Sequence, residues 1–227
     1  MRLQNTKTEL KRPWIRVRYP DTGSGKDVTY GGNQKRHPVK SIQTDGCGPL
    51  AAGDLLSYLE QTGTYENAAY EQRLVEMSRS YFPYKEHHGT SGFVIAGGLN
   101  RYFRTHQLPY RAAWALPRFR LYDRMAQMLQ ADLPVILTVG PHFPGIPPKH
   151  KLALYQKNTA GAYVQTNSTG GHYMVVTGMT RDWLRVSSWG EVYYINRREY
   201  LTYARRYSLF LFTNIVQIRP YPRSGTI

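Results

Sequence analysis

The strongest constraint on the fold is a change of pattern about halfway along the chain. Between residues 47 and 107, apolar residues recur at three- and four-residue spacing, which is typical of helices with one buried face. From residue 110 the chain changes to short runs rich in β-branched and aromatic residues, separated by turns. Helices followed by consecutive strands predict an α+β domain with an antiparallel sheet.

Three helices are predicted in the first half. The first begins at Cys47-Gly48-Pro49 and ends at Gly63, because proline suits a first helical turn and glycine suits a C-terminus. The other two span about 65–81 and 91–107, and Thr90-Ser91 can cap the second of them. The nucleophilic side chain of the cysteine therefore falls at the start of a helix.

The second half predicts strands with two further helices among them. The run from Leu133 to Val139 is apolar throughout apart from Thr138, as in a strand buried on both faces. We expect a proline-containing loop over 141–160 to act as a binding loop or lid. The other predicted elements are strands at 110–116, 172–179, 183–188, 191–195 and 209–218, and helices at about 119–130 and 197–206.

Positive charge is concentrated at the two ends of the chain. The sequence has 30 Lys and Arg against 15 Asp and Glu, a formal charge of +15. Glycine-rich turns break the periodicity of residues 1–40, so we expect a basic N-terminal arm with one short strand at Trp14–Tyr19, followed by a domain over 41–220. The arm should help to recruit a substrate or a surface without contributing to the chemistry. Its charge favours an anionic polymer or surface as partner, with simple solubility as the alternative.

Several classes of protein are excluded or disfavoured by composition. A chain of 227 residues can bury a large core, and its single cysteine excludes an intramolecular disulfide and a cysteine-ligated zinc site. Apolar runs are far shorter than a membrane span, and the N-terminus lacks a signal-peptide pattern, so we expect a soluble chain in the cytoplasm or exported by another route. The histidines lack ligand spacing, and no phosphate or dinucleotide motif is present, so neither metal nor cofactor is expected.

Chemistry is predicted at the single cysteine. Gly46-Cys47-Gly48-Pro49 leads directly into a helix, where unpaired N–H groups and the helix dipole favour a thiolate. Glycine on both sides leaves the sulfur open to approach. A lone cysteine is more often inert core, but these surroundings favour an activated nucleophile with a lowered pKa.

A base for this nucleophile is predicted 125 residues further along, where Gly170-Gly171-His172 opens a strand. Ser187-Ser188 ends a neighbouring strand, and one of these hydroxyls could orient the imidazole. Ser187 is the first choice. Ser188 is the alternative if the strand register is shifted by one, because adjacent strand residues point to opposite faces.

These segments resemble the papain-like cysteine peptidases, and most closely the bacterial branch related to bacteriocin-leader (double-glycine) peptidases. The resemblance covers about residues 41–206 and preserves the order of the motifs. The matching segments are Gln43 with Asp45-Gly46-Cys47-Gly48-Pro49, Leu133-Pro134-Val135-Ile136, Gly171-His172-Tyr173-Met174-Val175-Val176-Thr177-Gly178, Ser187-Ser188-Trp189-Gly190, and Val192-Tyr193-Tyr194-Ile195 before Arg198-Glu199-Tyr200-Leu201.

The resemblance implies a papain-like fold, with the nucleophile on a helix packed against a sheet that carries the base. Cys47 would be the nucleophile, His172 the general base and later acid, and Gln43 with the backbone N–H of Cys47 the oxyanion hole. The substrate-binding residues would be Gly46, Gly171 and Trp189.

The third catalytic position departs from the family pattern. Ser187 stands where such families usually carry Asn or Asp, and a neutral hydroxyl stabilises imidazolium less than a carboxylate does. The leading hypothesis is a thiol peptidase that hydrolyses a peptide or isopeptide bond of a peptide or protein substrate through an acyl-enzyme. Acyl transfer or deamidation by the same intermediate stays open. The rival hypotheses are a catalytically impaired binding or adaptor module and a basic binder of nucleic acid or another anionic polymer.

Overall fold

The computed structural model describes residues 7–20, 27–84, 89–115, 120–141 and 150–221. Its strands are β1 (Thr8–Glu9), β2 (Arg16–Arg18), β3 (Val28–Tyr30), β4 (Thr64–Glu66), β5 (Tyr110–Trp114), β6 (Val135–Val139), β7 (Leu152–Lys157), β8 (Tyr163–Thr169), β9 (His172–Met179), β10 (Trp183–Ser188), β11 (Glu191–Asn196) and β12 (Ile215–Pro220). Its helices are the 3₁₀ helix η1 (Gln34–Arg36), α1 (Lys40–Asp45), α2 (Cys47–Leu59), α3 (Asn67–Ser80), α4 (Gly92–Thr105), α5 (Leu121–Gln130) and α6 (Arg197–Arg206).

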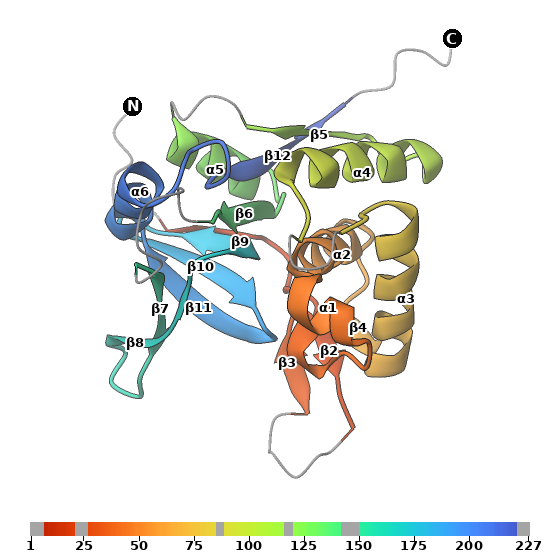
Figure 1. The fold of residues 1–227 in the computed structure, drawn as a ribbon, viewed down its shortest axis with the longest axis horizontal. Helices are drawn as coiled ribbons and strands as arrows, with labels where there is room; N and C mark the ends of the chain where they lie inside the picture. The colour runs from red at the N-terminus through yellow and green to blue at the C-terminus, as the bar shows by residue number, and fades with distance from the viewer. Residues whose placement is uncertain (1–6, 21–26, 85–88, 116–119, 142–149, 222–227) are drawn as a thin grey trace.

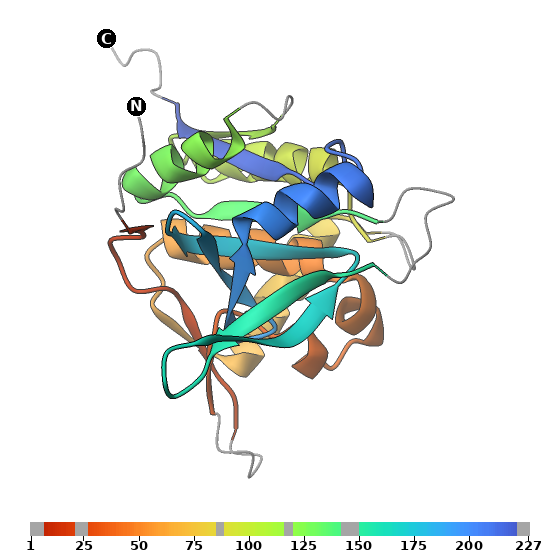
Figure 2. The same ribbon diagram turned by 90° about the vertical axis from the view of Figure 1, so that its left-hand side faces the viewer.

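The elements form two groups that face each other. Helices α1, α2 and α3 gather with a small sheet of order β3-β2-β4, and the long sheet with α6 lies opposite them (Figure 1). Over the described residues the long sheet has the order β5-β12-β6-β9-β10-β11-β7-β8, with β1 added to β9. All its pairings are antiparallel, and Figure 2 shows α6 lying across it. The protein is therefore of the α+β class with an antiparallel sheet, as the sequence predicts.

Helix α2 lies at the centre of the molecule and packs on β9 and β6. Every residue of α2 after Cys47 is buried, because other elements cover the faces that do not meet the sheet. Within α2 only its first residue, Cys47, is partly exposed. Within the described residues, no helix is both long enough and apolar enough to cross a membrane.

Within the described part of the loop expected over 141–160, residues from 152 onward belong to a hairpin. Leu152–Lys157 and Tyr163–Thr169 pair as β7 and β8, while residues 142–149 lie outside the described residues. Strand β8 is mostly solvent-exposed on both faces, so its sequence lacks the apolar alternation that marks a strand. The last strand begins at Ile215, later than predicted, because Leu209, Leu211 and Phe212 stay partly exposed in turns.

The described part of residues 1–40 is not a separate arm but belongs to the core. Trp14, Ile15, Val17 and Tyr19 are all buried. Strand β1 joins the long sheet, and β2 pairs with β3 and β4 in the small one. The basic residues interleaved with these side chains point outward and hide the apolar pattern in the sequence.

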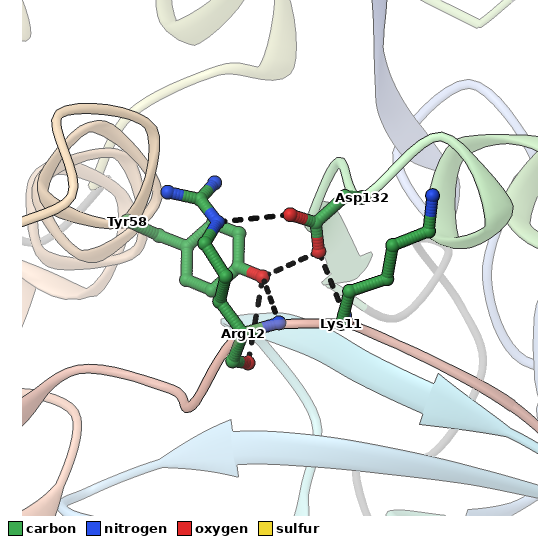
Figure 3. Close-up of polar contacts among 4 residues, drawn as sticks. All are labelled: Lys11, Arg12, Tyr58 and Asp132. Carbon is green, nitrogen blue, oxygen red and sulfur yellow. Dashed lines mark hydrogen bonds and ion pairs between the residues drawn. The ribbon is translucent and has the colours of Figure 1, made fainter.

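A polar cluster fastens this N-terminal segment to two other elements (Figure 3). The carboxylate of Asp132, just after α5, accepts hydrogen bonds from the Lys11 backbone N–H at 2.7 Å and from Arg12 Nε at 2.9 Å. The Tyr58 hydroxyl of α2 donates to the same carboxylate at 2.5 Å. Burial opposes ionisation, but these hydrogen bonds prevail and lower the pKa of Asp132.

Candidate active site

Cys47 is the first residue of α2, and Gly46 joins it directly to the end of α1. A Cβ at Gly46 would lie 2.5 Å from the carbonyl oxygen of Ile42, so the glycine is required for a tight junction between the helices. A Cβ at Gly48 would lie 3.2 Å from atoms of Thr90 and Ile95. Both glycines are buried and serve packing, whereas Cys47 itself is partly exposed.

The thiol of Cys47 has competing influences on its protonation. Burial is the largest and raises the pKa, although the backbone N–H groups of Tyr173, Gly48 and Cys47 itself stabilise the thiolate. The carboxylate of Asp45 raises the pKa further. Desolvation thus outweighs the start of the helix, and the expected lowering of the Cys47 pKa is wrong.

His172 opens β9 and is buried, with 6% of its surface exposed. Its Nε2 lies 2.7 Å from the hydroxyl oxygen of Ser188, and its ring stacks on Trp189 with the centroids 4.4 Å apart. Burial and, secondarily, the ammonium of Lys35 lower the pKa of His172 to about 3. At neutral pH the imidazole is therefore uncharged.

Ser188, not Ser187, contacts the imidazole. The Ser187 hydroxyl donates a hydrogen bond of 2.8 Å to the carbonyl oxygen of Tyr30, on the other face of β10. The register between β10 and β9 shifts between Arg185 and Val186, because β9 has one extra residue, Thr177, at this point. The bulge in β9 places Ser188 rather than Ser187 on the face of the sheet that carries His172. The expected contact of Ser187 with His172 is thus replaced by the alternative one residue later.

Trp189 owes its position to a tight turn. Trp189 and Gly190 have φ angles of 49° and 75° and form the two-residue connection between β10 and β11. A tryptophan in the left-handed region is uncommon and strained. The backbone N–H of Tyr30 donates to the carbonyl of Gly190 at 2.7 Å and braces the turn.

Lys35 completes a stack that sequence reasoning missed. Its Nζ lies 4.2 Å from the Trp189 ring centroid. Because His172 covers one face of the indole, the ammonium lies over the other face. The neighbouring Gln34 donates from Nε2 to the carbonyl of Gln43 at 2.9 Å. The expectation that residues 1–40 contain no part of the site is wrong. The one feature of the sequence that could have indicated this contribution is the Gly31-Gly32 turn just before η1.

Gln43 and Gly171 are the remaining residues predicted to belong to the site. The Gln43 amide donates to the carbonyl of His37 at 2.7 Å and accepts from Lys40 Nζ at 3.3 Å, so its donor is already engaged. Gly171 is exposed, with open space where a Cβ would lie.

No hydrogen bond joins the thiol of Cys47 to the ring of His172, both of which are described. The two residues are nonetheless linked through the N–H of Tyr173, the next residue after His172.

Comparison with known proteins gives no match to a family model and none to a curated protein. Among the described residues, no group of three or more His, Cys, Asp and Glu is placed to hold a metal ion. The chemistry available is therefore read from the side chains themselves. They offer a neutral thiol at a helix start and a neutral imidazole held by a hydroxyl and an indole.

Proposed function

We propose that this chain is a papain-like thiol hydrolase that cleaves a peptide or isopeptide bond through an acyl-enzyme at Cys47. The observation that carries the proposal is the His172–Ser188 hydrogen bond under the Trp189 ring, at a strand start whose next N–H points to the cysteine sulfur. A cysteine that served only in packing would need no imidazole held in a fixed orientation on the adjacent strand.

The proposed mechanism uses the tautomer of His172 that carries its hydrogen on Nε2. With the Nε2 hydrogen donated to the Ser188 hydroxyl, Nδ1 carries the lone pair and acts as the base. Trp189 shields this hydrogen bond from water. Ser188 is then the positioning residue that fixes the ring, and it supplies no charge.

The resting pair is neutral, so proton transfer belongs to the attack itself. Substrate binding brings Sγ of Cys47 and Nδ1 of His172 together, the sulfur bonds to the carbonyl carbon, and the imidazole takes the thiol proton. The tetrahedral oxyanion faces the backbone N–H of Cys47 and the amide hydrogen of Gln43 that is not donated to His37. His172 protonates the leaving amine, and water then attacks the thioester and returns the thiol.

The test is intact-mass labelling with a peptide aldehyde or peptide vinyl sulfone at pH 8. The wild type should gain one adduct, and Cys47→Ala should gain none. His172→Ala should slow labelling by about a hundredfold. Circular dichroism of each variant provides the folding control. A wild type that binds no such reagent while folded contradicts the proposal.

A second function is favoured by the raised pKa of Cys47 and by the missing thiol–imidazole hydrogen bond. The same fold could act as a binding module without turnover. Peptide binding that is equal in the wild type and Cys47→Ala, together with no labelling, would establish this second function in place of the first.

A further inference from the structure

A cavity between the N-terminal segment and the long sheet has no part in the proposed mechanism. It measures about 630 Å³ and lies between β3 with η1 on one side and β10, β11 and β7 on the other. Ligand sites commonly have volumes of about 300–1,000 Å³. Trp189 lines this cavity and also stacks on His172, so the cavity adjoins the candidate active site.

The cavity has an excess of positive charge. Three separate elements contribute Arg36, Lys157 and Arg185 to its wall, against the single carboxylate of Glu191. Nη1 of Arg185 lies 3.7 Å from a carboxylate oxygen of Glu9, a long ion pair on a partly exposed side chain. The net charge of the lining is three minus one, or +2, so an anionic occupant is favoured.

Two of these cations, Lys157 and Arg185, lie against aromatic rings. The Arg185 guanidinium lies 5.1 Å from the Tyr30 ring centroid. Nζ of Lys157 lies 5.1 Å from the Tyr163 centroid and 5.5 Å from that of Tyr194. Such contacts orient a cation without neutralising it. Both groups can therefore pair with a carboxylate of a ligand.

The aromatic rings of the cavity are already engaged, which disfavours a nucleotide. Binding of nucleic-acid bases relies on exposed ring faces for stacking. Here each of the three lining rings has an aromatic neighbour within 6.3 Å between centroids. The pairs are Tyr30 with Trp14, Trp189 with His172, and Tyr194 with Tyr163.

We propose that this cavity binds acidic side chains of the peptide substrate, close to the scissile bond. The inference rests on the proposed peptidase function and specifies its substrate class. Carboxylates suit the site because they pair with guanidinium and ammonium groups and need no free ring face.

Binding is measured with the folded Cys47→Ala variant, so that no turnover interferes. The probes are a fluorescent peptide with a run of glutamates and the same peptide with glutamines in their place. By fluorescence anisotropy the glutamate peptide should bind about tenfold more tightly at low salt. The difference should shrink as salt is added, because partly exposed ion pairs are screened. Equal affinity of the two peptides would overturn the proposal.

Two charge-matched variants locate the binding. Lys157→Gln removes a cation of the cavity, and Lys151→Gln removes an exposed cation just before the same strand, outside the cavity. The first should weaken the glutamate peptide about fivefold, and the second should leave its affinity unchanged. Equal losses in both variants would overturn the cavity as the site. A labelled oligonucleotide that displaces the peptide only when Lys157 is present would overturn the substrate class.

The two proposals fail separately. Acidic-peptide binding at Lys157 without labelling of Cys47 by electrophiles contradicts the peptidase and supports the cavity as an acidic-peptide site. Labelling of Cys47 with no preference between the two peptides supports the peptidase and overturns the cavity.

Discussion

At the scale of single residues, both members of the candidate catalytic pair are neutral, with His172 buried and Cys47 partly exposed. Burial raises the pKa of Cys47, and burial with Lys35 lowers that of His172 to about 3. A preformed thiolate–imidazolium pair is therefore not the resting state of the free protein. The rate at which Cys47 reacts therefore depends on pH through deprotonation of its thiol.

Alkylation of Cys47 by iodoacetamide should keep rising with pH beyond the free-thiol value of about 8.5. The physical reason is that desolvation disfavours the thiolate, so deprotonation needs a higher pH. The measurement is the labelling rate against pH, with glutathione as the free-thiol control. A rate that is already constant near pH 7 would contradict the raised pKa.

Ser188 and Ser187 form a matched pair for mutation, since they are adjacent, buried and chemically identical. Ser188→Ala removes the partner of the imidazole and should slow electrophile labelling about tenfold. Ser187→Ala removes the bond to Tyr30, and should lower the free energy of unfolding by about 1 kcal/mol without changing the labelling rate. Urea unfolding and labelling kinetics measure the two effects. If Ser187→Ala slowed labelling and Ser188→Ala did not, Ser187 would be the third catalytic residue.

At the scale of elements, η1 brings a cation to the far side of the Trp189 ring. Lys35→Gln should raise the pKa of His172, because it removes a positive charge that disfavours imidazolium. The imidazole titration is followed by NMR with ¹³C-labelled histidine. Lys11→Gln is the control, because Lys11 contacts Asp132 through its backbone N–H. An unchanged His172 titration in Lys35→Gln would show that the ammonium acts too weakly to matter.

The sequence predicted those elements whose pattern is local. The helix starting at Cys47 and the strand starting at His172 follow from apolar spacing and from proline and glycine, and both are present. The bulge at Thr177 of β9 has no local signal, so the choice between the two serines could not be predicted. The pKa of Cys47 was mispredicted because it depends on burial by elements distant in sequence.

The N-terminal segment was mispredicted for the same reason, because its structure depends on elements distant in sequence. Its basic residues suggested a solvated arm, yet Trp14, Ile15 and Val17 are core residues. Their short strands are completed by pairing with distant partners, which no window of sequence reveals.

At the scale of the whole molecule, a buried carboxyl links the fold to pH. Asp54 of α2 is 1% exposed and accepts hydrogen bonds from the Tyr70 hydroxyl and, at 3.1 Å, from the Gly32 N–H. Burial raises its pKa to about 7, against those hydrogen bonds. The folded state therefore binds a proton at this carboxyl over a pH range in which the unfolded chain has lost it.

Asp54→Asn should remove this linkage. The protonated carboxyl contributes fully below about pH 4, and its contribution is lost as pH rises to about 7, with a slope of at most about 1.4 kcal/mol per pH unit. The difference in unfolding free energy between the wild type and Asp54→Asn, from urea titrations at several pH values, should fall over that range. A constant difference would contradict the raised pKa.

The pairing of β1 with β9 also bears on how the chain is made. Thr8 meets Met179, 171 residues further along, so β1 leaves the ribosome long before its partner strand is synthesised. The backbone of β1 stays unpaired with β9 meanwhile, and loop closure over this separation slows folding. Nascent chains arrested before β9 should bind holding chaperones through this segment, and release should coincide with synthesis of the central strand.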